Sequence, residues 1–215
     1  MIEQQVSGTV YGVVLNDRAS LARIGSDALE AAPYKGAPRA PALYIKPAGT
    51  RVPGGSVVSL PAGATAVEVG ATVGLVMGRA AARLSADTAL EAVAGVVLAA
   101  DLSLPHASYY RPAIREKCFD GALPLGPVQP LTDLASLSLT TRIDGEVVET
   151  RSLADLLRDP ARLLADVTGF MTLAEGDVLL VGVSYLAPQA VAGSRVSVHA
   201  EALGTLDFSI AGAQA

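Results

Sequence analysis

The chain has 215 residues, which is enough for one domain with a sizeable core and short for two ordinary domains. Hydrophobic residues make up 51% of the sequence, but the longest apolar stretch, residues 178–193, contains Ser184, Tyr185, Pro188 and Gln189. A membrane-spanning helix needs about 20 consecutive apolar residues, so we expect no membrane partner. The net charge of −5 and the lack of a basic run argue against nucleic-acid binding.

The cellular compartment is suggested by two further features. The single cysteine, Cys118, cannot form a disulfide within the chain. The N-terminus lacks the basic start and apolar stretch of a signal peptide. We therefore expect a cytoplasmic protein whose partner is a small molecule or another protein.

The first half of the chain is typical of short strands separated by turns. A strand is expected within the first 15 residues, ending at Asn16, and residues 19–41 are expected to form loop or short helix. Further strands are predicted at Ala42–Lys46 and 57–60, with a turn at residues 53–55 between them. A long strand is predicted at Ala66–Met77.

The second half contains the few predicted helices. A helix is expected from Ser85, followed by a buried strand after Gly95 that ends at Asp101. Asp144-Gly145 predicts a hairpin between strands at 137–143 and 146–151. A helix at 152–168 is interrupted by Asp159-Pro160, so two short helices are an alternative. Strands are expected at 178–182 and, as the last strand, Arg195–Ala200.

This pattern predicts an α+β, β-dominated fold with peripheral helices. Many short strands and few helices favour a roll or barrel. We expect a single domain over residues 1–215, in which residues 1–41 form a smaller N-terminal lead-in segment.

Residues 101–127 are the most informative segment for chemistry. An acid, Asp101, ends an apolar strand, and a dense group of polar side chains follows in one loop. This group consists of Tyr110, Arg111, Arg115, Lys117 and Asp120. Mixed cations and acids at the mouth of a β core can bind a small dicarboxylate or oxoacid. Composition alone is equally compatible with a solvated loop whose charges neutralise one another.

Several short motifs occur in the order found in one known family. They are Tyr44-x-Lys46-Pro47, Asp101-x-Ser103, Lys117-x-Phe119-Asp120, Pro124-x-Gly126-Pro127, Leu173-x-x-Gly176-Asp177 and Leu203-Gly204. Together they span residues 43–204 and resemble the fumarylacetoacetate hydrolase superfamily. The resemblance implies that family's mixed β-sandwich roll.

Within the superfamily, the chain resembles the N-terminal half of bifunctional isomerase/decarboxylases of 4-hydroxyphenylacetate (homoprotocatechuate) breakdown. Residues 12–16 and the Tyr110-Arg111-Pro112 stretch carry this likeness. It implies chemistry on 5-carboxymethyl-2-hydroxymuconate and 5-oxopent-3-ene-1,2,5-tricarboxylate. In such enzymes a Glu-x-Glu pair and the Asp of Asp-x-Ser hold Mg²⁺ or Mn²⁺, which chelates the oxo acid.

The sequence departs from this metal-binding pattern. Counting back from Gly78, the two glutamate positions fall on Gly70 and Thr72, so only Asp101 remains. A lone aspartate with neutral neighbours would hold a divalent ion poorly, and we expect no metal on this chain alone. Glu68 shares the strand face, but residues 68 to 72 span about 13 Å. It is therefore expected to be an edge or surface acid.

Two more departures affect proton transfer and substrate contact. Asp17 stands where active relatives would be expected to carry a histidine, and Gly182-Val183-Ser184 replaces Gly-Thr-Pro. Of the two histidines, His106 in the site loop is a candidate proton carrier, whereas His199 in the last predicted strand is expected to be structural.

The resemblance and the chemistry of these side chains suggest a role for each candidate. Lys117 and His106 are the candidate catalytic residues, because a lysine can anchor a carboxylate or polarise a carbonyl. Tyr110, Arg111 and Arg115 are candidate substrate-binding residues. Asp120 is expected to pair with one of these cations and organise the loop.

Three hypotheses follow. The first is a subunit of the isomerase/decarboxylase that forms a homodimer or, with a paralogous subunit bearing the metal, a heterodimer; its ligand is an oxo di- or tricarboxylate, and activity is expected from the assembly. The second is a non-catalytic pseudoenzyme that binds an oxoacid. The third is a metal-independent tautomerase or hydrolase that uses Lys117 and His106.

Overall fold

In the computed structural model, residues 6–31, 35–106 and 113–213 are described. Their strands form an eight-stranded sheet, with the order β2-β1-β10-β5-β6-β7-β3 and β11 also paired with β5. It contains β1 (Val10–Val14), β2 (Ala42–Lys46), β3 (Arg51–Pro53), β5 (Ala66–Met77), β6 (Val93–Ser103), β7 (Leu123–Gln129), β10 (Val178–Leu180) and β11 (Gln189–Val191).

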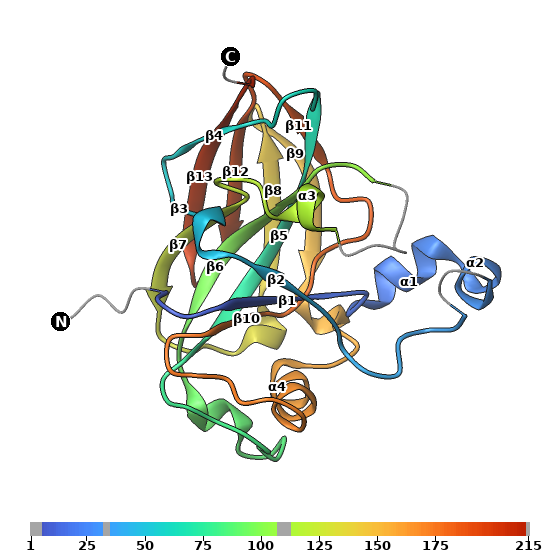
Figure 1. The fold of residues 1–215 in the computed structure, drawn as a ribbon, viewed down its shortest axis with the longest axis vertical. Coiled ribbons are helices and arrows are strands. Elements are labelled where there is room, and N and C mark those ends of the chain that lie inside the picture. The colour runs from blue at the N-terminus through green and yellow to red at the C-terminus, as the bar shows by residue number, and fades with distance from the viewer. Residues whose placement is uncertain (1–5, 32–34, 107–112, 214–215) are drawn as a thin grey trace.

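A second, five-stranded sheet has the order β4-β13-β12-β8-β9. Its strands are β4 (Val57–Ser59), β8 (Ser138–Ile143), β9 (Glu146–Ser152), β12 (Arg195–Ala200) and β13 (Gly204–Ala211). The α-helices are α1 (Arg18–Ile24), α2 (Ser26–Glu30), α3 (Ile114–Lys117) and α4 (Pro160–Thr168). Figure 1 shows α1 and α2 on one side of the strands and α4 at one end. The predicted β-dominated fold with peripheral helices is confirmed.

The antiparallel pair β5 and β6 forms the centre of the molecule. On one face of the pair, residues such as Val69, Val73 and Leu98 belong to the main core, which includes residues of the second sheet. On the other face, Val76 and Val97 belong to a smaller apolar cluster with strands β1 and β10. Because both faces are covered, the two strands have nearly continuous apolar sequences.

Several predicted elements have the expected bounds. Strands β2 and β5 coincide with the predicted ranges. The hairpin joins β8 to β9, and Asp144 (φ 53°) and Gly145 (φ 89°) both have the positive φ of a type I′ turn. The stretch 152–168 forms two short helices, η4 (Leu153–Asp155, a 3₁₀ turn) and α4, and the Asp159 side chain caps α4. No helix in the described ranges is long and apolar enough to cross a bilayer.

Two predictions were wrong. The helix expected from Ser85 is only a 3₁₀ turn, η2 (Ala89–Ala92), and strand β6 begins at Val93 and continues past Asp101 to Ser103. Pairing with β5 over this whole length stabilises the strand more than local helix propensity favours a helix. Nor is β12 the last strand, because β13 follows it and buries Leu206, Phe208 and Ile210.

Candidate functional site

The site is organised by a buried carboxylate, Asp101, on β6. The first sheet curls so that β2 reaches β6, although three strands separate them in the sheet order (Figure 1). Lys46 of β2 places its Nζ 2.6 Å from Asp101 Oδ1. The same ammonium donates to the carbonyls of Leu102 (2.7 Å), Lys117 (2.6 Å) and Ala122 (3.0 Å).

A second lysine and a tyrosine complete the cluster. Lys117 Nζ lies 3.2 Å from Asp101 Oδ2 and 4.5 Å from the centroid of the Tyr44 ring. The Tyr44 hydroxyl donates a hydrogen bond to the same carboxylate. The neutral neighbours considered from the sequence were Gly70 and Thr72, and the structure adds two ammonium groups that contact Asp101. We call Tyr44, Lys46, Asp101 and Lys117 the Asp101 cluster.

Tyr44 and Lys46 belong to one of the sequence motifs but were not among the predicted site residues. Residues two apart on a strand share a face, so the Tyr-x-Lys spacing does indicate that both side chains point the same way. Their contact with Asp101 depends on the curl of the sheet, which no local spacing reveals.

The charges of the cluster shift its pKa values. Burial alone would raise the pKa of the Asp101 carboxyl, but Lys117, Lys46 and the hydrogen bonds that it accepts outweigh this effect and lower that pKa. Burial lowers the pKa of Lys46, opposed by the Asp101 charge. Burial and the nearby carboxylate raise the pKa of Tyr44 well above its usual value. The carboxylate form of Asp101 is thus strongly favoured.

The two positions expected to correspond to the glutamate pair lie on β5, opposite Asp101 and Ala99 of β6. Gly70 is paired directly with Asp101 between β5 and β6. A Cβ at position 70 would lie 2.8 Å from Val183 Cγ1 and 2.9 Å from the Asp101 carbonyl oxygen. The Thr72 hydroxyl is buried and donates to the Gly182 carbonyl (2.6 Å). Space that a side chain at position 70 would need is therefore occupied.

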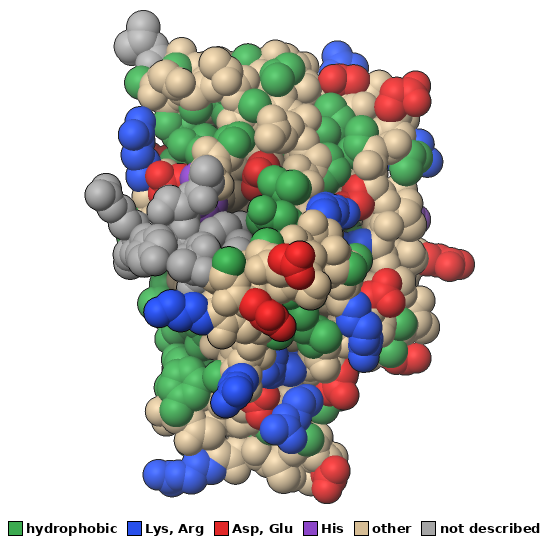
Figure 2. Space-filling model, turned by 90° about the vertical axis from the view of Figure 1, so that its right-hand side faces the viewer, with side chains coloured by type: hydrophobic (Ala, Val, Ile, Leu, Met, Phe, Trp, Pro, Cys, Tyr) green, Lys and Arg blue, Asp and Glu red, His purple; other side chains and the backbone are tan. Residues whose placement is uncertain are grey.

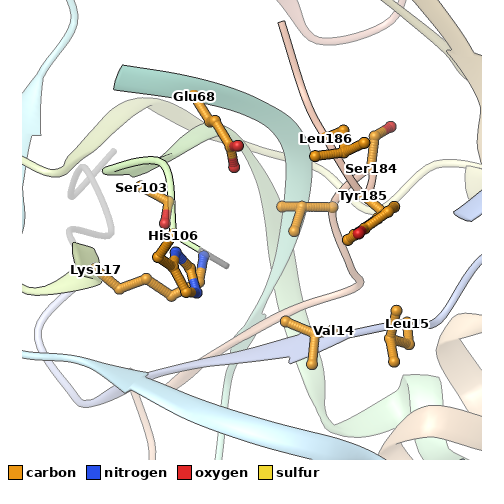
Figure 3. Close-up of a pocket in the computed structure, with 10 residues that line it drawn as sticks. Val14, Leu15, Glu68, Ser103, His106, Lys117, Ser184, Tyr185 and Leu186 are labelled. Atoms are coloured by element: carbon orange, nitrogen blue, oxygen red, sulfur yellow. The ribbon is translucent and has the colours of Figure 1, made fainter. Parts of the chain in front are cut away.

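A pocket opens next to the Asp101 cluster (Figure 3). We call it the Lys117 pocket, and its lining consists of Val14, Leu15, Glu68, Ser103, His106, Lys117, Val183, Ser184, Tyr185 and Leu186. In Figure 3, Ser103, His106 and Lys117 lie together, Glu68 approaches the same space from β5, and Ser184, Tyr185 and Leu186 form the opposite wall. Both sides of the pocket thus carry polar groups, and Val14, Leu15, Val183 and Leu186 add apolar surface.

Glu68 was expected to be an edge or surface acid, and this prediction was wrong. Its side chain is half-buried in the wall of the pocket, and its backbone is paired with Ser103. The strand pairing with β6 extends two residues beyond Asp101, which brings Glu68 to the pocket. Burial raises the pKa of the Glu68 carboxyl, and the nearby His106 and Lys117 partly oppose this shift.

The other candidates divide into those at the pocket and those away from it. His106 lines the pocket and forms a hydrogen bond between Nδ1 and the Leu104 carbonyl (3.0 Å). Arg115 is exposed on α3, and Asp120 is exposed in the turn that follows. Asp120 makes no ion pair with Arg115 or Lys117. Tyr110 and Arg111 lie outside the described residues.

Asp17 has a structural role at the edge of the site. Its carboxylate caps α1 by accepting hydrogen bonds from Ser20 N and Ser20 Oγ, both at 2.7 Å. Ser20 Oγ in turn accepts a hydrogen bond from Tyr185 N (2.8 Å), so α1 is joined to a wall of the pocket. His199 lies on β12 and contacts Thr205 (3.0 Å), apart from the pocket lining.

The charged surface gives no sign of a polyanion-binding patch on the face that can be viewed. Figure 2 shows acidic and basic side chains interspersed over this face. Such a mixed surface is unlike the clustered lysines and arginines of nucleic-acid-binding domains.

The fold and the ordered motifs define a fumarylacetoacetate hydrolase-like protein. The model of the family "Fumarylacetoacetate (FAA) hydrolase C-terminal" matches residues 9–211, and the chain belongs to this family. A 4-hydroxyphenylacetate degradation bifunctional isomerase/decarboxylase from Salmonella dublin is 38% identical over 202 residues, which are 94% of this chain and 47% of the relative. This chain thus spans about half the length of that curated relative.

Solved structures agree on the fold. The 5-carboxymethyl-2-hydroxymuconate delta-isomerase from Mycobacterium smegmatis has a TM-score of 0.81 at 26% identity, covering 97% of this chain and 78% of that chain. Fumarylpyruvate hydrolase from Pseudomonas aeruginosa, in complex with Mn²⁺ and pyruvate, has a TM-score of 0.81 at 21% identity, covering 95% and 89%. The resemblance in sequence motifs and the predicted fold class are both confirmed.

Proposed function

We propose that this chain is the metal-poor half of an isomerase/decarboxylase that acts on 5-carboxymethyl-2-hydroxymuconate and 5-oxopent-3-ene-1,2,5-tricarboxylate. A related unit with an intact Glu-x-Glu pair completes the assembly and binds Mg²⁺ or Mn²⁺. The likeness to the bifunctional enzyme over 94% of the chain supports the reaction class. A second copy of this chain would bring no further Glu-x-Glu pair, which favours a related unit over a homodimer.

The surroundings of Asp101 are the observation that carries this proposal. A divalent cation needs several anionic oxygens, but Gly70 offers none and the Thr72 hydroxyl is bonded to Gly182. Both oxygens of Asp101 are already in ion pairs with Lys46 and Lys117. Within the described ranges, no three His, Cys, Asp or Glu side chains are grouped to hold a metal. The residues present therefore do not fit a three-carboxylate metal site.

Coexpression tests whether decarboxylation needs both this chain and a related unit that binds the metal. The chain is produced with a related protein that has the Glu-x-Glu pair, and decarboxylation of the tricarboxylate is measured with added Mg²⁺. We expect activity from the pair and none from this chain alone. As a control, the same pair with both glutamates of the related protein changed to Gln is expected to be inactive. Decarboxylation by this chain alone with Mg²⁺ would contradict the proposal.

A non-catalytic oxoacid-binding role is the second candidate, and Lys117 in the pocket wall is the observation that favours it. A calorimetric titration with a 2-oxo diacid in EDTA distinguishes the two functions when it is combined with the coexpression assay. Binding to this chain, together with an inactive coexpressed pair, would support the pseudoenzyme.

A further inference from the structure

We propose that a buried water molecule binds between strands β8 and β9, where it bridges the side chains of Thr141, Glu149 and Arg151. None of these residues lines the Lys117 pocket, so the site is separate from it. The inference goes beyond the proposed function and does not depend on it. The water is part of the folded structure, because it completes the hydrogen bonding of three buried polar groups.

Three buried polar atoms on β8 and β9 have no hydrogen-bond partner among the described residues. They are Thr141 Oγ1, Glu149 Oε2 and Arg151 Nη2. Thr141 is 0% exposed and Arg151 is 9% exposed, so bulk solvent does not satisfy their polar atoms. A buried polar atom without a hydrogen bond costs free energy, and few such atoms remain in native proteins. The three atoms therefore point to a small ligand that forms hydrogen bonds with all of them.

The strand pairing places the three side chains on the same face of the second sheet. Thr141 of β8 is paired with Glu149 of β9, so their Cβ atoms lie about 5 Å apart. Arg151 follows Glu149 by two residues and thus points to the same face, about 7 Å further along the strand. Burial lowers the pKa of Arg151, and the charge of Asp17, followed by that of Glu149, opposes this shift. One small molecule can therefore contact all three side chains.

The charges and the donors of the site favour water over an ion. The guanidinium of Arg151 and the carboxylate of Glu149 balance, so the three side chains carry no net charge. A chloride would be repelled by Glu149, and a small cation would be repelled by Arg151. A water molecule accepts from Arg151 Nη2, donates to Glu149 Oε2 and takes either role with the Thr141 hydroxyl. Three hydrogen bonds are typical of a buried water.

The position of the site gives the water access and a structural role. Strand β9 is an edge strand of the second sheet, and Glu149 is partly exposed, so water can enter from this side. The other amino group of Arg151, Nη1, donates to the carbonyls of Ala71 (3.0 Å) and Gly182 (2.7 Å). By binding Nη2, the water holds the guanidinium in the orientation that these two hydrogen bonds need.

A high-resolution crystal structure of the full chain, from crystals soaked in bromide, tests the identity of the ligand. We expect density for one water within hydrogen-bonding distance of Thr141 Oγ1, Glu149 Oε2 and Arg151 Nη2, without an anomalous signal from bromide. Three results would each overturn the inference. They are a direct ion pair between Glu149 and Arg151 Nη2, density for an ion, and a site without density.

The stability of Thr141→Val tests the same site in solution, because the sign of its change depends on the water. If the water is bound, valine removes a hydrogen bond, and the folding equilibrium constant from urea unfolding should fall about 5-fold. Without the water, valine removes an unsatisfied hydroxyl and should stabilise the protein. Thr150→Val is the matched control and should unfold like the wild type, because Thr150 is exposed on the other face of β9. A Thr141→Val protein at least as stable as the wild type would contradict the inference.

Discussion

The pairing of Asp101 with two lysines differs from an ordinary ion pair in how it stabilises the fold. Lys46 is almost completely buried and uses its ammonium to hold three backbone carbonyls as well as the carboxylate. A buried charge is tolerated only when it is paired and hydrogen-bonded, and both conditions hold here. The cluster therefore fixes β2, β6 and the end of α3 relative to one another.

The acid dependence of stability tests the state of Asp101. Its folded pKa is lowered, so its stabilising contribution is present above the unfolded pKa of about 3.9 and is lost as the pH falls through the folded value. We expect the free energy of unfolding of the wild type to decrease below about pH 4. Asp101→Asn should be less stable at neutral pH and should show a shallower acid dependence. Urea unfolding at several pH values measures both, and an unchanged acid slope in Asp101→Asn would contradict this.

Glu68 has the opposite pH dependence. Its folded pKa is raised, so folding favours the protonated acid, and the associated stability is present below the unfolded pKa and is lost as pH rises through the folded value. Glu68→Gln, which stays neutral, should therefore be more stable than the wild type at pH 7, and the difference should shrink at acidic pH. Thermal unfolding at pH 7 and pH 4 checks this, with Glu201→Gln as the exposed control. A destabilised Glu68→Gln at pH 7 would show that the ionised carboxylate stabilises the fold.

At the scale of elements, the pairing of β5 with β6 determines which side chains meet. Gly70 lies opposite Asp101, and Glu68 lies opposite Ser103. One strand pair therefore brings Gly70, at an expected glutamate position, close to Glu68, the carboxylate that lines the pocket. The loop after β10 then closes over Gly70 through Val183. The space beside Gly70 that a side chain would need is thus filled by Val183 of the loop after β10.

Gly70→Ala is expected to destabilise the protein by about 1–3 kcal/mol, the usual range for overpacking a well-filled site. The added Cβ would lie 2.8 Å from Val183 and 2.9 Å from the Asp101 carbonyl, and the backbone contact cannot move easily. Gly126→Ala on β7 is the control, because its nearest contact would be 3.4 Å away. Chemical denaturation measures both variants. Equal free energies of unfolding for the two variants would show that the loop after β10 moves to accommodate the added Cβ without strain.

At the scale of the whole molecule, sequence patterns predicted the strands better than their arrangement. The range of β5 was predictable because its apolar run is nearly continuous, and the β8–β9 turn because Asp144-Gly145 favours positive φ. The alternation of Leu206, Phe208 and Ile210 is the sequence signal of β13. The Asp101 cluster was only partly predictable, because Lys46 reaches it through the curl of the sheet. The position of Glu68 was not predictable from Asp101 as a strand end, because β6 continues two residues further to Ser103.

One buried arginine joins the two sheets. Along one side of β5, β10 pairs with residues 74–76 and β11 with residues 66–68, which leaves a gap between the two pairings. Arg151 of β9, in the second sheet, fills this gap by donating to the Ala71 carbonyl (3.0 Å) and the Gly182 carbonyl (2.7 Å). Burial lowers the pKa of Arg151, and the negative charge of Asp17 opposes this shift.

Arg151→Leu tests whether this bridge holds the sheets together. Leucine fills part of the volume but removes the donor to the buried Ala71 carbonyl, whereas the Gly182 carbonyl keeps its hydrogen bond from the Thr72 hydroxyl. An unsatisfied buried polar group costs about 1–3 kcal/mol. We expect a loss of this size in the free energy of unfolding, measured in urea. Arg142→Leu is the control, since Arg142 is exposed and bonds only to the Gly145 carbonyl in its own hairpin, so its effect should stay within about 0.5 kcal/mol. Because Gly182 precedes Val183 in the pocket wall, Arg151→Leu should also weaken binding of 2-oxoglutarate, whereas equal binding by both variants would confine the bridge to a role in stability.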